Sequence, residues 1–404
     1  MTLNKRIITA IATGAVLVNA LAPMAFASTI TVSGNGEKSS NQVSVNTNST
    51  VQVQQSNNAN ISNNVNSSSS TGGNSSNGNT GGSTSITTGN ATSNTTVTNA
   101  ANLNKADLSN CGCNSGAANV NVTGNGEDSN NTVGVSNANS VYVNQTNNAN
   151  FDNNVNSKAQ TGGNDATSNT GGNTSITTGD AMANTTVSNA ANANVASVGE
   201  GVNGGAGGSS VTISKNGENS SNVVGLEQSS AIVLAQSNDA NFKNTVDADA
   251  KTGHNTANGN TDGNVSITTG DAKTGVSVDN AANFNAADLY CGCVLDGLNV
   301  DINKNGEDSW NAVEADANNV VAPEQANDQG FWNNVDGSSK TGSNTAVSNT
   351  GGNTDPAVST GDGASTTNVN NTGNVNTIGN VGGVTLGTTF DFSGLWLFLN
   401  GLMA

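Results

Sequence analysis

The sequence has little of the material from which catalytic sites and large cores are usually built. Its 404 residues include 1 histidine, 4 cysteines and 11 lysines and arginines, which leaves few groups for acid–base, metal or phosphate chemistry. Aromatic residues make up 3% and hydrophobic residues 33%, so a conventional globule would lack large side chains for its core. Asparagine, serine and threonine are abundant beside 49 glycines. This composition is typical of a disordered chain or of a repeat fold with a thin core, and we expect no enzymatic activity.

The first 27 residues differ from everything that follows. Lys5 and Arg6 precede an apolar run over residues 7–21, and residues 25–27 read Ala-Phe-Ala, a small-x-small cleavage pattern. These features predict a signal peptide over residues 1–27 that is removed before Ser28. The apolar run is short for a membrane span, so we expect a secreted, extracellular protein at the cell surface with no transmembrane span in the mature chain.

The charge balance is strongly acidic. The formal net charge is −18, and loss of Lys5 and Arg6 with the signal peptide would make it −20 (−18 − 2). A chain of this charge is disfavoured as a partner for nucleic acid or anionic lipid. Self-association and other surface components, polysaccharide among them, are the partners that we expect.

An internal repeat organises the chain after the signal peptide. Asn-Gly-Glu recurs at Asn35, Asn125, Asn216 and Asn305, at steps of 90, 91 and 89 residues (125 − 35, 216 − 125, 305 − 216). We therefore divide the chain into module 1 (28–119), module 2 (120–210), module 3 (211–299), module 4 (300–379) and an apolar C-terminal segment (380–404). The element Asn-Ala-Ala-Asn closes the first three modules in this division.

Within each module, apolar and polar residues alternate in one continuous phase. In module 1 the apolar residues form pairs, such as Val43 with Val45 and Val51 with Val53, and the same pairs recur in modules 2 and 3. A period of two predicts β-strands. Because asparagine, serine and threonine separate the pairs, we expect strands of about three to five residues joined by polar corners, and almost no helix.

The predicted fold class is all-β, as a parallel β-solenoid built from four repeats. A solenoid needs only small and β-branched residues in its core, and asparagine and threonine can stack in hydrogen-bonded ladders along its coils. Glycine-rich elements, such as Thr71-Gly72-Gly73, would turn the corners. Tandem β-sandwich modules are the alternative, but module 1 has no aromatic residue between Ser28 and Cys111 to fill such a core. Disorder of the Ser/Asn/Gly stretches is a third alternative.

A family resemblance rests on segments such as Gln42-Val43-Ser44-Val45-Asn46 and residues 50–57, Thr-Val-Gln-Val-Gln-Gln-Ser-Asn. These segments resemble the secreted β-solenoid repeats of bacterial surface fibres and adhesins, including curlin-type subunits. The likeness spans nearly all of the mature chain but lies in composition and alternation, and the repeat here is much longer than that of curlins. The resemblance implies an extracellular structural or adhesive role and carries no individual residue over.

The cysteines occur as two Cys-Gly-Cys elements, Cys111 with Cys113 and Cys291 with Cys293. They are candidates for a disulfide or a cross-link, because export favours oxidation. If each module makes four or five coils about 4.8 Å apart, two modules separate the pairs by about 40 Å, which a disulfide does not bridge. A bond inside each element, a link to another chain and free thiols remain open. A four-cysteine zinc site would need a different spacing.

Two further groups of residues are candidate sites. Asp180, Asp271 and Asp362 follow glycine at equivalent turns and are weak candidates for calcium, although the calcium-binding pattern of β-rolls is missing. No other cofactor is expected, and the single histidine, His254, has no catalytic partner. The apolar C-terminal segment contains Phe390, Phe392, Trp396 and Phe398, which we interpret as a cap over the last coil or as a docking strand.

From these observations we expect an asparagine-rich structural protein of a cell surface, extracellular matrix or biofilm that acts by self-assembly into fibres or as an adhesin. A solenoid that binds or cleaves carbohydrate is an alternative, but such an enzyme would need a cluster of carboxylates that the repeats do not offer. A disordered, hydrated matrix polymer is the other alternative.

Overall fold

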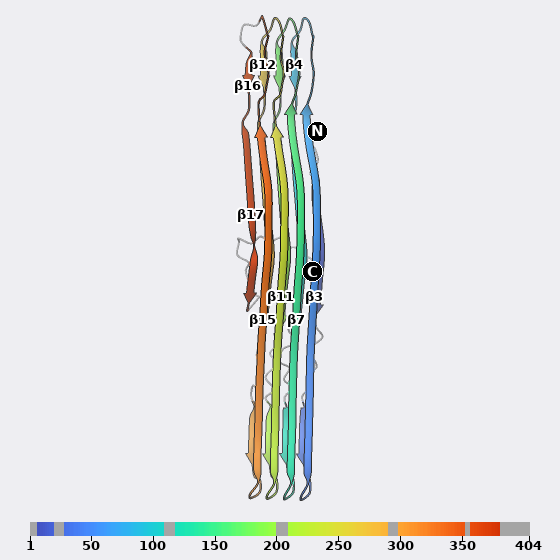
Figure 1. Cartoon of the computed structure of the whole chain (residues 1–404), viewed down its shortest axis with the longest axis vertical. Coiled ribbons are helices and arrows are strands. Elements are labelled where there is room, and N and C mark those ends of the chain that lie inside the picture. Colours follow the sequence, from blue (N-terminus) through green and yellow to red (C-terminus); the bar gives the residue numbers. More distant parts are fainter. Residues whose placement is uncertain are drawn as a thin grey trace.

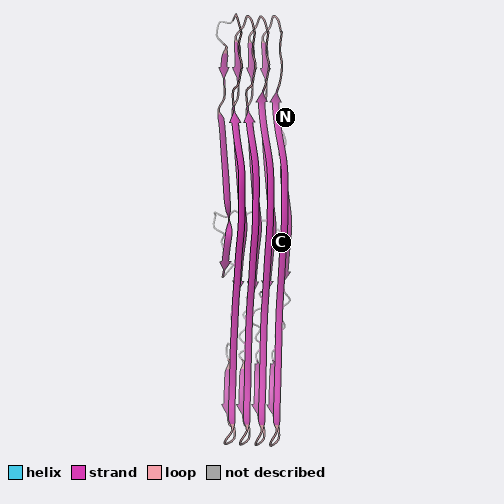
Figure 2. Cartoon of the chain, in the orientation of Figure 1, coloured by secondary structure: helices cyan, strands magenta, loops and turns pink. Residues whose placement is uncertain are grey.

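The computed structural model describes residues 6–19, 28–108, 118–198, 209–289, 298–351 and 356–379, and for residues 6–19 the backbone alone. Within these ranges every regular element is a β-strand (Figure 2). None of them contains a helix long and apolar enough to cross a membrane. The prediction of an all-β, parallel solenoid of four repeats is confirmed.

The strands form four parallel sheets, which we name A to D. Sheet A contains β1 (Arg6–Asn19), β5 (Ala91–Leu108), β9 (Ala181–Val198), β13 (Ala272–Leu289) and β17 (Gly363–Ile378). Sheet B contains β2 (Ser28–Ser33), β6 (Ala118–Thr123), β10 (Ser210–Ser214) and β14 (Asn299–Asn303). Sheet C contains β3 (Ser40–Gly72), β7 (Asn130–Gly162), β11 (Ser221–Lys251) and β15 (Trp310–Lys340). Sheet D contains β4 (Thr84–Thr87), β8 (Thr174–Thr177), β12 (Val265–Thr268) and β16 (Ala357–Ser359).

Each module forms a single coil of the solenoid, which we call a rung. Rung 1 consists of β2 to β5, rung 2 of β6 to β9, rung 3 of β10 to β13 and rung 4 of β14 to β17. Equivalent residues of successive rungs pair in register, as Val43 with Val133, Val133 with Val224, and Val224 with Val313. Because every sheet takes one strand from each module, the tandem-sandwich alternative is wrong. Figure 1 shows the four rungs side by side, with their strands along the long axis of the molecule.

The strands of sheet C are far longer than the alternating pairs predict. β3 and β7 have 33 residues each and β11 and β15 have 31, so that the longest strands extend for about 110 Å. The expectation that the alternating pairs form strands of three to five residues, and that each module makes four or five coils, is wrong; short strands occur in sheets B and D instead. The polar residues between the apolar pairs are not corners: Asn57 and Asn63 lie in the middle of β3 and are buried.

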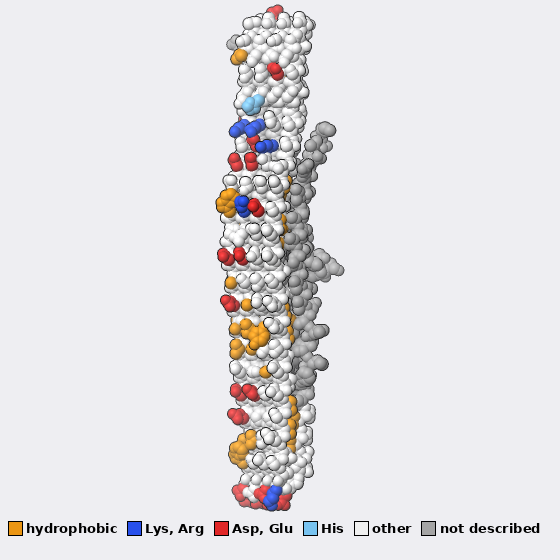
Figure 3. All heavy atoms as spheres, turned by 45° about the vertical axis from the view of Figure 1, so that its right-hand side comes forward, with side chains coloured by type: hydrophobic (Ala, Val, Ile, Leu, Met, Phe, Trp, Pro, Cys, Tyr) orange, Lys and Arg blue, Asp and Glu red, His pale blue; other side chains and the backbone are white. Residues whose placement is uncertain are grey.

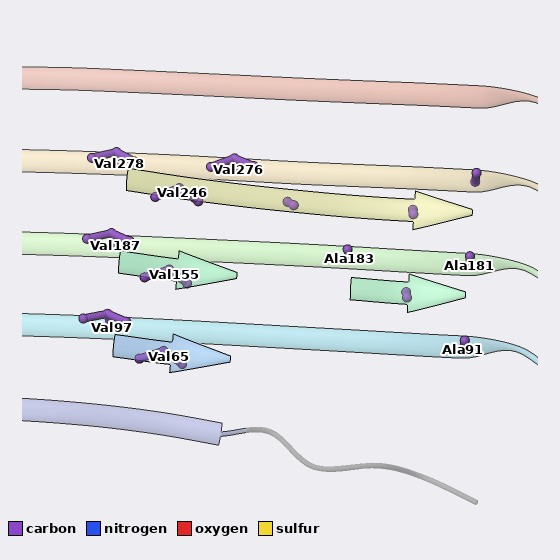
Figure 4. Close-up of a cluster of buried hydrophobic side chains, with 14 residues drawn as sticks. Val65, Ala91, Val97, Val155, Ala181, Ala183, Val187, Val246, Val276 and Val278 are labelled. Carbon is purple, nitrogen blue, oxygen red and sulfur yellow. The ribbon is translucent and has the colours of Figure 1, made fainter. Parts of the chain in front are cut away.

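The core lies between two layers of sheet. Sheet C forms one layer, and sheets A and B lie end to end in the other, so that Val65 of β3 packs with Ala91 and Val97 of β5 (Figure 4). Nearer the other end, Ile30 and Val32 of β2 pack against Val43 and Val45 of β3. Outward-facing residues of β3 are exposed and inward-facing ones are buried or half-buried, which is the alternation that the sequence shows.

Glycines form the turn that follows each long strand, as expected. Gly72 has φ +117°, and a Cβ added to it would lie 1.9 Å from the carbonyl oxygen of Gly162 in the next rung. Gly162 stands in the same relation to Gly253, with φ +100° and 2.0 Å. The stacked turns thus approach so closely that only glycine fits.

The Asn-Ala-Ala-Asn element lies in the middle of a strand and does not close the module. Its last residue, Asn102, has φ +63° and is passed over in the pairing of β5 with β9. This irregularity shifts the alternation in β5. Odd-numbered residues face the core up to Ala101, and even-numbered residues, starting with Asn102 and Asn104, face it afterwards. Asn192 and Asn283 repeat the conformation, with φ +64° and +62°.

One strand precedes the repeats. β1, which falls within the predicted signal peptide, runs parallel to β5, with Arg6 opposite Thr95 and Asn19 opposite Asp107. It occupies the edge of sheet A at which a rung before rung 1 would pair.

Candidate functional site

The most distinctive feature of the described chain is a set of amide columns that run through all four rungs. In each column the same amide residue recurs in every rung, and its side chain bonds to that of the next rung at 2.6–3.1 Å. In rung 1 the columns start at Asn35, Asn41, Gln55, Asn57, Asn63, Asn74, Asn79, Asn99, Asn102 and Asn104. Ladders of asparagine were expected from the composition, but these residues were not predicted to form them. The signal that could have identified them is their recurrence at the module spacing.

All the asparagine columns have the same direction. Asn35 Nδ2 donates to Asn125 Oδ1, Asn125 Nδ2 to Asn216 Oδ1, and Asn216 Nδ2 to Asn305 Oδ1, at 2.8, 2.9 and 3.0 Å. The glutamine column has the opposite direction, since Gln145 Nε2 donates to Gln55 Oε1 at 2.7 Å. A column is therefore polar along the stack, and its two ends present complementary groups.

Two pairs of columns join sheet C to sheet A through the core. Asn63 of β3 donates to Asn99 of β5 at 2.9 Å, and Asn99 donates to Asn153 of β7 at 2.9 Å. Asn153 donates in turn to Asn189 of β9 at 3.1 Å. The columns that start at Asn57 and Asn104 are joined in the same way. These paired columns satisfy amides that would otherwise destabilise a buried layer.

An aromatic column lies beside the amides. Phe151 and Phe242 stack with ring centroids 4.8 Å apart and an interplanar angle of 3°, and Phe242 is 5.5 Å from Phe331. Ile61 holds the position in rung 1. The phenylalanines of rungs 2 to 4 thus follow the same register between rungs as the amides.

The outer edge of β15, the last strand of sheet C, lacks one backbone donor. Trp310 N donates to Ser220 O in rung 3. Backbone N–H groups alternate in direction along a parallel strand, and Pro323 is an odd number of residues after Trp310. An N–H at position 323 would therefore point away from rung 3. The equivalent residues of rungs 1 to 3 are Val53, Val143 and Leu234. Rung 4 therefore has one donor fewer on its outer edge than a regular strand.

The predicted calcium candidates lie in one column, in which the carboxylates of Asp180 and Asp271 accept backbone hydrogen bonds from the next rung. Asp180 Oδ1 accepts the N–H of Asp271 at 2.8 Å, and Asp271 Oδ1 accepts that of Asp362 at 3.0 Å. Lys273 Nζ is 3.0 Å from the second oxygen of Asp271. The bond from Asp362 and the ion pair with Lys273 lower the pKa of Asp271 below its usual value. Across the described residues, no three carboxylate, histidine or cysteine side chains gather as metal ligands.

None of the other predicted site residues lies in the part of the chain that the structure describes. Cys111, Cys113, Cys291, Cys293, Phe390, Phe392, Trp396 and Phe398 lie outside the described residues. The strands that flank the cysteine elements correct one premise: Leu108 and Leu289 belong to rungs 1 and 3, which are two strand spacings apart, about 10 Å in place of about 40 Å. The expected separation of about 40 Å between the two cysteine elements is therefore wrong.

The surface is mostly uncharged and polar. Figure 3 shows few charged side chains on the face that it presents, and several of them form short rows across the rungs. A shallow groove on the outer face of sheet C lies over Gly134 and Gly225, bordered by Glu227, Glu314 and Asp316. His254 is exposed, with φ +55°, and its backbone N–H donates to Gly342 O. The described surface thus offers polar faces and open strand edges as its main features.

No family model, curated protein or solved structure matches the chain.

Proposed function

We propose that the protein is a secreted structural component of a cell surface or extracellular matrix that acts by fibre formation or adhesion, and we assign it no catalytic role. The observation that carries the proposal is the set of polar amide columns that ends at an open strand edge in rung 4. A second copy, stacked with its rung 1 on that edge, would continue each asparagine column in the same direction.

The two ends match in register as well as in polarity. Through the pairings of sheet C, Val313 of rung 4 is equivalent to Val43 of rung 1, Gln325 to Gln55, and Asn333 to Asn63. A head-to-tail contact would therefore place valine on valine and amide on amide. Because such a heterologous contact does not close on itself, it gives a filament.

Strand β1 and Pro323 would both oppose the stacking of one chain on another. β1 covers the edge of β5 along most of that strand, so removal of the predicted signal peptide would expose an edge of sheet A. Pro323 removes one N–H from the outer edge of rung 4. Assembly would thus begin only after export and would remain slower than the columns alone allow.

The proposal is tested by electron microscopy and fibre diffraction of residues 28–404 over a range of protein concentrations. We expect filaments whose axis is perpendicular to the strands, with a repeat of about 4.8 Å along that axis. Particles that remain single at every concentration would exclude fibre formation and leave adhesion. A strand direction along the filament axis would exclude stacking of rungs.

Two proline variants sharpen the test. Pro323→Val restores the outward N–H, and we expect filament growth to become about fivefold faster, as one hydrogen bond of about 1 kcal/mol allows. Pro356→Val is the matched control, because Pro356 precedes β16 and lies outside the long strand. Equal growth rates for the two variants would show that the edge of β15 takes no part in assembly.

A further inference from the structure

The edge of sheet B at rung 4 exposes core side chains. Val300 and Ile302 of β14 are 41% and 44% exposed, whereas the equivalent Val211 and Ile213 of β10 are 0% exposed. Asn299 N donates to Ser209 O in rung 3, so the N–H groups of Val300 and Ile302 point away from rung 3. No strand among the described residues pairs with this edge. An apolar strip with unpaired donors of this kind fits one more β-strand.

The C-terminal segment contains a sequence that matches the missing strand. Residues 388–394 read Thr-Thr-Phe-Asp-Phe-Ser-Gly, and residues 28–34, which form β2 and its following glycine, read Ser-Thr-Ile-Thr-Val-Ser-Gly. Phe390 follows Val300 by 90 residues (390 − 300), and Phe392 follows Ile302 by the same number (392 − 302). The steps between Ile30, Val120, Val211 and Val300 are 90, 91 and 89 residues, so the spacing is that of one more module.

Two local details agree with this register. The residue after each strand of sheet B has a left-handed backbone, with φ +68° at Gly34 and +71° at Gly124, and Gly394 would supply that conformation without strain. The connection also has the right length. Asn299 follows Ala287 by 12 residues (299 − 287), and Thr389 follows Ile378, the equivalent of Ala287, by 11 (389 − 378).

We propose that residues 388–393 form a fifth strand of sheet B, paired with β14 of the same chain, in which Phe390 and Phe392 cover Val300 and Ile302. Asp391 would take the outward position beside the exposed Asp301. The repeat stops there, because the Asn-Gly-Glu element that follows every strand of sheet B is absent after Gly394. The segment is thus the start of a fifth rung that ends after its first strand.

The proposed strand forms within one chain, with or without fibres, and it affects assembly. The proposed strand occupies the edge that β2 of a second copy would need in a head-to-tail stack. The C-terminal segment and a second copy therefore compete for β14, and removal of the segment should favour stacking.

Residue-resolved hydrogen exchange of residues 28–404 tests the proposal. In the complete mature chain, we expect the amides of Val300 and Ile302 to exchange at least tenfold more slowly than in a chain that ends at residue 385. The variant Phe390→Asn with Phe392→Asn should behave as the shortened chain does. Phe398→Asn is the matched control, since it removes an aromatic side chain outside the proposed strand and should leave both amides protected.

The outcomes separate the occupants of this edge. Protection that is independent of protein concentration and lost in the double variant supports the proposal. Protection that appears only at high concentration would assign the edge to a second copy and overturn it. Equal, fast exchange in the complete and shortened chains at low concentration would also overturn it, and this result does not depend on whether filaments form.

Discussion

Removal of one central column amide, in the variant Asn153→Ala, should destabilise the protein strongly. The Asn153 side chain is 0% exposed and makes four hydrogen bonds. It accepts from Asn63 and Asn99 at 2.7 and 2.9 Å and donates to Asn244 and Asn189 at 2.8 and 3.1 Å. At about 1 kcal/mol for each bond, the free energy of unfolding should fall by about 4 kcal/mol. The measurement is urea unfolding of residues 28–404, followed by circular dichroism at a concentration where the chain is monomeric.

The same strand offers a matched control. Asn150 lies three residues earlier in β7, on the exposed face, and its side chain donates a bond of 3.4 Å to Asn60. Asn150→Ala should change the free energy of unfolding by no more than about 0.5 kcal/mol. If the two variants differ by less than about 1 kcal/mol, the columns do not stabilise the stack in the way that their geometry implies.

Two further predictions concern the turns and the acidic column. Gly162→Ala should lower the free energy of unfolding by at least about 2 kcal/mol, because its Cβ would meet the backbone of Gly253 at a left-handed φ. Gly134 lies in the same strand with open space around it, so Gly134→Ala should have little effect. Equal denaturation midpoints for the two variants would contradict this. The lowered pKa of Asp271 contributes stability that is present above its ordinary value of 3.8 and is lost as the pH falls through the lower folded value. Asp271→Asn should therefore lose less stability than the parent between about pH 5 and about pH 3, and parallel pH profiles of the unfolding midpoint would refute the assignment.

The sequence determined the repeat, the strand content and the parallel stacking. The steps of 89 to 91 residues and the unbroken alternation of apolar and polar residues in each module predicted a four-repeat β-solenoid, which the pairing of Val43, Val133 and Val224 confirms. The same spacing contains the residues of the amide columns. Recurrence of a residue at the module period is a property of the sequence alone, and it does not depend on the shape of one coil.

The size of one coil was decided only by the tertiary structure. Asn57 and Asn63 separate apolar pairs, and a local reading makes them corners of short strands, because an isolated amide is unfavourable in a core. In the folded chain each is buried in a strand of 33 residues and bonded to an identical side chain 90 residues away, Asn147 or Asn153. A window of neighbouring residues does not contain that partner. Burial of the amides becomes favourable only when the next rung, which has the same amide at the equivalent position, lies one strand spacing away.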